Sequence, residues 1–167
     1  PMTLDQLLLG AADDAVILVL DQVTDPQNIG AAARNAAAFG ASAIVLTDRH
    51  STSAEPTLMK AASGALEFVP LVRVTNLART LDQLKEAGYW CIGLADDAKE
   101  PLGAAPFDGQ VALIMGSEGR GLRHLTRTHC DMLVSLPTKA PINAINIAAA
   151  SAVVLYEITR QRQILAD

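Results

Sequence analysis

The chain has 167 residues, of which 50% are hydrophobic and 19% are charged. This length and composition suffice to bury one core and indicate one domain rather than two. The formal net charge of −5 argues against a general nucleic-acid binder, because such proteins usually carry a basic field that attracts phosphate. The charge is uneven, however. Arginines and histidines cluster over residues 120–129 and favour a local anionic partner.

Membrane spans, metal sites and disulfides are not indicated. The apolar runs, such as residues 16–20 and 111–115, are far too short to cross a bilayer, so we expect a cytoplasmic protein without membrane contact. Cys91 and Cys130 have no metal-ligand spacing around them and are interpreted as small core residues. The histidines show no such spacing either, so no metal is expected.

Residues 1–14 form a short, weakly patterned lead-in. Because Pro1 precedes Met2, we interpret this stretch as the remnant of a linker and residues 15–167 as the functional domain. A further N-terminal domain is therefore expected to be absent from this chain.

Short aliphatic runs then alternate with helical patterns. The expected strands are 16–20, 43–46, 68–74, 90–94, 111–115 and 132–136. The first expected helix starts at Pro26 and ends before Gly40. The other expected helices span 57–64, 77–87, 122–128 and 147–162. Residues 95–109 are expected to form a loop, and Pro70 should make its strand an edge strand or an irregular one. This alternation predicts an α/β fold with a mainly parallel sheet flanked by helices.

The first helix is unusual because it consists mostly of glycine and alanine, which lets its backbone pack very closely. Asp25 is a suitable N-cap for it and Pro26 a suitable first residue. Asn28 and Arg34 are its polar exceptions and hence candidate functional residues, although a simple surface role for Arg34 is equally compatible with the pattern.

A glycine-rich turn follows the strand 111–115. Gly116, Gly119 and Gly121 allow left-handed backbone and close approach of a ligand to bare amides. Glu118 lies within this turn and is a candidate for chemistry, although an incidental glutamate in a strand-to-helix turn fits as well. In parallel sheets, ligands bind outside the carboxyl ends of the strands. Three loops leave those ends: the loop after Leu94, the glycine turn and residues 136–146.

Three segments together resemble the SpoU/TrmH family of the SPOUT superfamily, whose members are RNA ribose 2′-O-methyltransferases. The segments are Asp25-Pro-Gln-Asn-Ile-Gly-Ala-Ala-Ala-Arg34, Met115-Gly-Ser-Glu-Gly-Arg-Gly121 and Leu136-Pro137 through Asn146 with the alanine-rich helix that follows. The resemblance extends from about residue 16 to residue 163. It implies a C-terminal deep trefoil knot, S-adenosylmethionine as cofactor and a homodimer in which the partner completes each site.

The resemblance also assigns residues. It places cofactor contacts, largely through the backbone, at Leu94, Ala95, Gly116, Leu136 and Ile145, and the functional polar positions at Asn28, Arg34, Glu118 and Asn146. The usual Ser-Leu-Asn-Val-Ser of the family reads here Ala144-Ile-Asn-Ile-Ala148. With both serines replaced by alanine, any hydroxyl-like contact would have to come from Asn143.

Residues 69–79 look most like the branch that methylates a guanosine of large-subunit (23S) ribosomal RNA. Members of that branch usually carry an N-terminal RNA-binding domain. Transfer RNA is the alternative substrate, and a non-catalytic cofactor- or RNA-binding module is the alternative class. A guanidinium with a pKa above about 12 is a poor base. We therefore expect Arg34 to pair with the adjacent phosphate while Glu118 and Asn28 hold Arg34 and the ribose.

Overall fold

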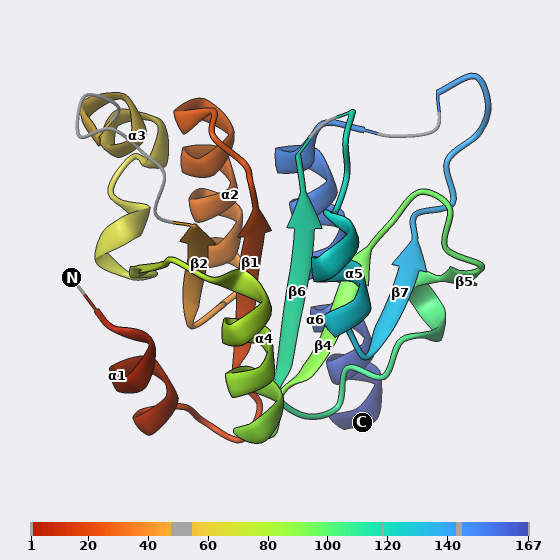
Figure 1. Ribbon diagram of the computed structural model, residues 1–167, viewed down its shortest axis with the longest axis horizontal. Helices are drawn as coiled ribbons and strands as arrows, with labels where there is room; N and C mark the ends of the chain where they lie inside the picture. Colours follow the sequence, from red (N-terminus) through yellow and green to blue (C-terminus); the bar gives the residue numbers. More distant parts are fainter. Residues whose placement is uncertain (1, 48–54, 118, 143–144, 167) are drawn as a thin grey trace.

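The computed structural model describes residues 2–47, 55–117, 119–142 and 145–166. Its strands form one sheet in the order β3-β2-β1-β6-β4-β7-β5, and every pairing between them is parallel (Figure 1). The strands are β1 (Val16–Asp21), β2 (Ala43–Thr47), β3 (Leu71–Val74), β4 (Trp90–Leu94), β5 (Glu100–Pro101), β6 (Val111–Gly116) and β7 (Met132–Ser135). This confirms the predicted α/β fold with a parallel sheet.

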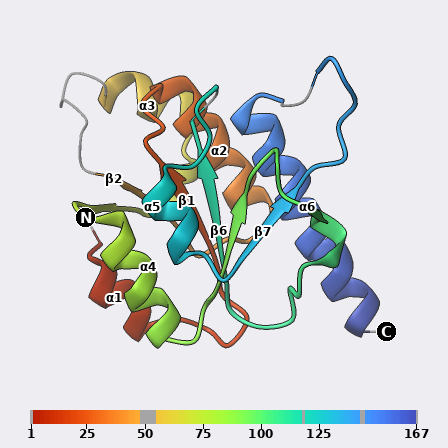
Figure 2. The same cartoon turned by 45° about the vertical axis from the view of Figure 1, so that its right-hand side comes forward.

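Helices cover both faces of the sheet. One face carries α2 (Pro26–Ala38), α3 (Glu55–Ala62) and α6 (Ile147–Ala166), and the other carries α1 (Leu4–Leu9), α4 (Leu77–Glu86) and α5 (His124–His129) (Figures 1 and 2). The aliphatic runs of the central strands supply both cores. Leu18 and Ile44 pack into the core under α2 and α6, whereas their neighbours Ile17 and Val45 pack into the core under α1 and α4. Strands buried on both faces explain why the sequence shows continuous apolar runs instead of alternation.

The first helix has the caps and the close packing that its composition predicts. The side chain of Asp25 accepts a hydrogen bond from the amide of Gln27 at 2.9 Å, and Pro26 is the first helical residue. A Cβ added at Gly30 would lie 2.4 Å from the Cβ of Ala61 on α3. The backbones of α2 and α3 therefore meet at a distance that only glycine permits.

Three details differ from the sequence-based expectations. The lead-in contains α1, which starts with a capping box between Thr3 and Gln6 and buries Leu7. The expected loop 95–109 contains the short strand β5 and the 3-10 helix η3 (Leu102–Ala104), and the last helix continues to Ala166. Pro70 limits its strand as expected, since β3 begins at Leu71 and lies at the sheet edge. A second 3-10 helix, η2, spans Ala65–Glu67.

Both cysteines are free thiols, with Cys91 buried and Cys130 half-buried. Burial raises the pKa of each thiol to about 12, so neither is a reactive thiolate at neutral pH. No helix among the described residues is long and apolar enough to span a membrane. Within the same residues, no cluster of His, Cys, Asp or Glu is suited to hold a metal ion. The trefoil knot stays a prediction.

Candidate active site

A pocket of about 540 Å³ opens at the carboxyl edge of the sheet. The loops that follow β4, β6 and β7 converge at this edge (Figure 2). The pocket is lined by Leu94, Ala95, Asp96, Asp97, Met115, Gly116, Ser117, Gly119, Arg120, Gly121, Arg127, Ile145, Asn146, Ile147 and Ala150. Its volume is in the range of small-molecule and cofactor sites. All three of the loops singled out in the sequence contribute to it.

The glycine turn folds back over the end of β6. The amide of Gly121 donates to the carbonyl of Ser117 at 2.8 Å, and the backbones of these two residues also form an isolated antiparallel bridge. Gly119 and Gly121 have φ angles of +81° and +66°, the left-handed region that favours glycine. A Cβ at Gly116 would lie 2.2 Å from the carbonyl carbon of Gly121. The turn therefore presents bare backbone to the pocket.

A buried ion pair holds the exit of this turn. Asp21 ends β1 with its side chain fully buried, and its carboxylate accepts from the backbone amide of Arg123 at 3.0 Å and from Nε of Arg123 at 2.8 Å. Two hydrogen bonds to one buried carboxylate fix the start of α5 relative to β1. Sequence reasoning missed this pair. The available signal was an aspartate that ends an apolar strand in a chain with a separate basic cluster.

A second ion pair lies at the rim of the pocket. Nη1 and Nη2 of Arg127 on α5 donate to the two carboxylate oxygens of Asp97 at 3.0 and 3.2 Å. Hydrogen bonding to Arg127 lowers the pKa of Asp97, and the positive charge of the arginine lowers it further. The pair joins the loop after β4 to α5, and both residues line the pocket. Asp97 was not singled out in the sequence either.

The first turns of α2 and α6 are joined by asparagines. Nδ2 of Asn146 donates to Oδ1 of Asn28 at 3.2 Å. Oδ1 of Asn146 accepts from the amides of Ala148 and Ala149 at 2.8 and 3.3 Å, so Asn146 acts as the N-cap of α6. About two turns further along α2, Nδ2 of Asn35 donates to the carbonyl of Ala148 at 2.7 Å. Asn35 was missed in the sequence because one asparagine on an alanine-rich helix carries no distinctive signal.

The predicted site residues are only partly gathered in this pocket. Five of them line it: Leu94, Ala95, Gly116, Ile145 and Asn146. Asn28 reaches it through Asn146, as described above. Leu136 is absent from the lining and packs against the core, and Arg34 is exposed on α2, also outside the lining. Glu118 and Asn143 lie outside the described residues. The functional roles of all these residues stay predictions.

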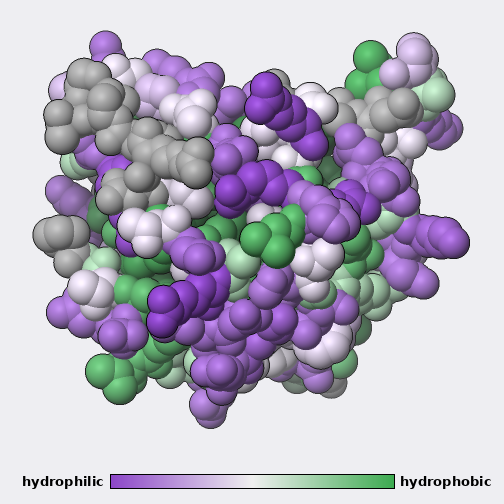
Figure 3. All heavy atoms as spheres, in the orientation of Figure 1, coloured by the Kyte–Doolittle hydropathy of each residue, from purple (hydrophilic) through white to green (hydrophobic). Residues whose placement is uncertain are grey.

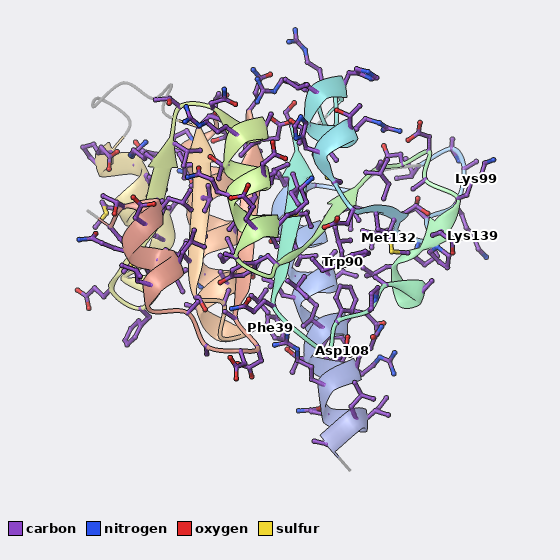
Figure 4. The ribbon with its side chains drawn as sticks, turned by 60° about the horizontal axis from the view of Figure 1, so that its bottom comes forward. Phe39, Trp90, Lys99, Asp108, Met132 and Lys139 are labelled. Atoms are coloured by element: carbon purple, nitrogen blue, oxygen red, sulfur yellow. The ribbon has the colours of Figure 1, made fainter. Side chains whose placement is uncertain are left out.

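Charges of both signs lie at the pocket, since Asp96 and Asp97 line it together with two arginines. Arg120 and Arg127 line it, and the exposed Lys99 and Lys139 lie at the outer edge of the sheet near β5 and β7 (Figure 4). The view of Figure 3 shows mostly hydrophilic residues on the face that carries α4 and α5. Because Arg127 is paired with Asp97, Arg120 is the guanidinium of the described lining that no printed ion pair involves.

Fold and pocket together define the class of protein. It is a parallel α/β domain with a cofactor-sized pocket, built largely from backbone at the carboxyl ends of its strands. The model of the SpoU rRNA Methylase family matches residues 15–156. The chain belongs to this family, which confirms the resemblance noted in the sequence.

Among curated proteins, the chain is similar to the 23S rRNA (guanosine-2'-O-)-methyltransferase RlmB of Ralstonia nicotianae, with 48% identity over 98% of this chain and 66% of the relative. It is also similar to RlmB of Escherichia coli K12, with 43% identity over 93% of this chain and 64% of the relative. The chain thus spans slightly less than two thirds of these relatives.

Among solved structures, it is similar to the SpoU methyltransferase AviRb from Streptomyces viridochromogenes in complex with the cofactor AdoMet. That match has a TM-score of 0.84 and 29% identity, and it covers 91% of this chain and 59% of the other.

Proposed function

We propose that this domain transfers a methyl group from S-adenosylmethionine to a ribose 2′-hydroxyl of RNA. The single observation that carries the proposal is the pocket of about 540 Å³ at Leu94, Gly116 and Ile145, because three glycines of the turn, Gly116, Gly119 and Gly121, line it and present backbone without side chains to a ligand. Family membership and the AdoMet complex of AviRb support the same cofactor.

The residues of the pocket fit the cofactor. Leu94, Ala95, Gly116 and Ile145 would hold it, largely through backbone groups that need no particular side chain. When bound, S-adenosylmethionine supplies an electrophilic methyl group. The protein's contribution is then to orient the ribose hydroxyl, to exclude water and to stabilise charge.

Arg34 is the residue that we assign to the hydroxyl. A guanidinium is not a base at neutral pH, but it binds phosphate through two parallel hydrogen bonds. Its positive charge beside the 2′-hydroxyl lowers the pKa of that hydroxyl, and the proton leaves to phosphate or water. Asn28 and Asn146, which bond to each other at 3.2 Å, position the ribose near it. Glu118 is assigned to holding Arg34.

The favoured substrate is a guanosine of 23S ribosomal RNA, because both RlmB relatives are named for that reaction. A cytoplasmic location follows from the same substrate. We also propose a homodimer whose partner subunit completes each site. The exposed position of Arg34 outside the pocket of its own subunit supports this arrangement. An N-terminal RNA-binding domain, as implied by the resemblance, remains part of the proposal.

Transfer of a radioactive methyl group tests the reaction. We expect this chain to bind S-adenosylmethionine and the full-length protein to label 23S ribosomal RNA but not transfer RNA. Label in transfer RNA alone would replace the substrate, and label in neither RNA would reject the enzyme.

Substitution of Arg34 tests its role. Arg34→Lys keeps the charge but loses the planar fork, so turnover should fall by about 10-fold or more. Lys60→Arg, an equally conservative change at an exposed position of α3, is the matched control and should leave turnover unchanged. Near-normal turnover of Arg34→Lys would remove Arg34 from the mechanism.

A further inference from the structure

A second, smaller pocket of about 160 Å³ lies at the same edge of the sheet, on the other side of α5. It is bounded by the end of β2, the start of α4 and the start of α5, and Thr47, Thr75, Leu77, Ala78, Arg123 and Thr126 are among the residues that line it. None of these residues lines the cofactor pocket. The segment from Arg120 to Arg127 contributes to both pockets and so forms the wall between them.

Two threonine hydroxyls face this pocket without a hydrogen-bond partner in the described chain. Thr47 and Thr126 are only 5% and 1% exposed, and within the described part of the chain neither hydroxyl makes a hydrogen bond. Thr47 follows Val45 on the face of β2 that is turned towards α4, so its side chain lies beneath the start of that helix. Among the described residues, the fully buried side-chain polar atom without a partner is the hydroxyl of Tyr89, so the two threonine hydroxyls remain accessible from the pocket. In this common lining, both hydroxyls are free to donate to a ligand that accepts hydrogen bonds.

The start of α4 offers further donors to the same space. α4 has ten residues, and its N-cap Asn76 accepts from the amide of Arg79 at 3.0 Å. Leu77 and Ala78 are the first two residues of α4, so their amides have no carbonyl partner within the helix. Both residues line the pocket. The positive end of the helix dipole therefore also points towards this space.

The charge of the lining is positive. Arg123 uses its backbone amide and Nε for Asp21, while its two terminal nitrogens have no partner among the residues that the structure describes. Among the residues that the structure describes, the lining contains no carboxylate, and its remaining side chains are hydroxyls, one amide and small or apolar groups. Hydroxyls, helix amides and a guanidinium around one small space suit an anion with several acceptor oxygens.

We propose that this pocket binds a phosphate group, and that in the working enzyme the group is a phosphodiester of the substrate RNA. The second part rests on the proposed function. A volume of about 160 Å³ admits a phosphate together with part of its ribose. Because the segment 120–127 separates the two pockets, a phosphate bound on one side of it anchors the RNA strand next to the cofactor on the other side.

Inorganic phosphate is the first probe, with backbone amide chemical shifts as the readout. We expect saturable shifts of Leu77 and Ala78, while the amides of the cofactor pocket respond to S-adenosylmethionine. Thr47→Val and Thr126→Val preserve side-chain shape and remove one donor each, so each should weaken phosphate binding by about 10-fold. Thr47→Ser and Thr126→Ser retain the hydroxyl and should bind within about 3-fold of the original protein.

The melting temperature and the affinity for S-adenosylmethionine serve as controls for correct folding. The valine variants should leave both quantities unchanged. Absence of saturable shifts at Leu77 and Ala78, or equal phosphate affinity in the valine and serine variants, would overturn the phosphate site. Shifts spread over unrelated surface amides would mean non-specific binding of the anion and would overturn it as well.

Methyl transfer by the full-length protein is the second arm. The valine variants should raise the KM for RNA by about 10-fold at an unchanged KM for S-adenosylmethionine, and the serine variants should restore it. Normal KM values in variants that have lost phosphate binding would show that the site takes free phosphate only, and would reject the RNA assignment. Phosphate binding without any methyl transfer by the original protein would reject the proposed function and leave the phosphate site standing.

Discussion

At the end of β6, Gly116 leaves no room for one additional carbon. A Cβ added at Gly116 would lie 2.2 Å from the backbone carbonyl carbon of Gly121, so the whole turn would have to move. Overpacking costs about 1–3 kcal/mol. We expect Gly116→Ala to weaken S-adenosylmethionine binding by about 10-fold or more, measured by calorimetry. Gly103→Ala, where a Cβ meets nothing within 4 Å, is the matched control. Equal affinities would show that the turn does not contact the cofactor.

At Tyr89 we expect the opposite effect, because removal of its hydroxyl oxygen should stabilise the protein. The residue is 3% exposed, burial raises its pKa, and its hydroxyl has no hydrogen-bond partner within the described residues. A buried hydroxyl without a partner costs about 1–3 kcal/mol. Tyr89→Phe should therefore raise the free energy of unfolding by about 1 kcal/mol in urea denaturation. The exposed Tyr156 supplies the control Tyr156→Phe, and a destabilised Tyr89→Phe would reveal an unrecognised partner.

At the scale of elements, the contact between α2 and α3 depends on Gly30. An added Cβ would lie 2.4 Å from the Cβ of Ala61 and 2.8 Å from its carbonyl carbon. Alanine favours helix over glycine by about 1 kcal/mol, but separating two packed backbones costs more. Gly30→Ala should lower the free energy of unfolding by about 1–3 kcal/mol. Gly10→Ala, with 3.7 Å to its nearest neighbour, is the control. Stabilisation of Gly30→Ala would contradict this packing.

Elements with a strong local signal were predictable from the sequence. β1, β2 and β6 are largely continuous aliphatic runs, and α2 has a cap, an initial proline and a terminal glycine. Elements without such a signal were not. α1 is a different case, because its capping box of Thr3 and Gln6 can be read in the sequence and was overlooked. β5 has only two residues and exists only through its pairing with β7. Weak local preference was overridden there by tertiary contacts.

The candidate site shows the same division. Its glycine turn and the three strand ends could be located from sequence, because parallel topology brings strand ends together. Two ion pairs could not be located from the sequence, Asp21 with Arg123 and Asp97 with Arg127. Their residues are 102 and 30 positions apart, and the pairing depends on the direction of the side chains. The second pocket was likewise invisible, because threonines at a strand end and on a helix carry no pattern.

For the molecule as a whole, one exposed surface is suited to pair with a second copy. Along α6, Val153 is 45% and Tyr156 56% exposed, and Tyr156 packs edge-on against Phe39 at the end of α2 with ring centroids 6.4 Å apart. Phe39 lies at the opposite edge of the sheet from the cofactor pocket (Figure 4). Arg34 is also exposed on α2. A two-fold interface over α2 and α6 would bury these side chains and bring Arg34 of one protomer towards its partner.

Mixing two variants with different defects distinguishes a shared site from a self-contained one, provided that S-adenosylmethionine is too dilute to fill the Gly116→Ala pocket. Arg34→Ala keeps the cofactor pocket, and Gly116→Ala keeps Arg34. In a mixed dimer with shared sites, the intact pocket of the first variant receives Arg34 from the second, and one of two sites works. Random exchange of subunits makes half of the dimers mixed, so activity should recover to about a quarter of that of the original protein.

The measurement is methyl transfer to RNA after the two variants are unfolded and refolded together, with each variant refolded alone as the control. Circular dichroism and sedimentation establish that both variants fold and dimerise. If Arg34 served its own subunit, the two defects would fall on different sites of the mixed dimer. One site would then lack Arg34, and the other would lack cofactor. Activity would then stay at the level of the separate variants, and the exposed position of Arg34 would need a different explanation.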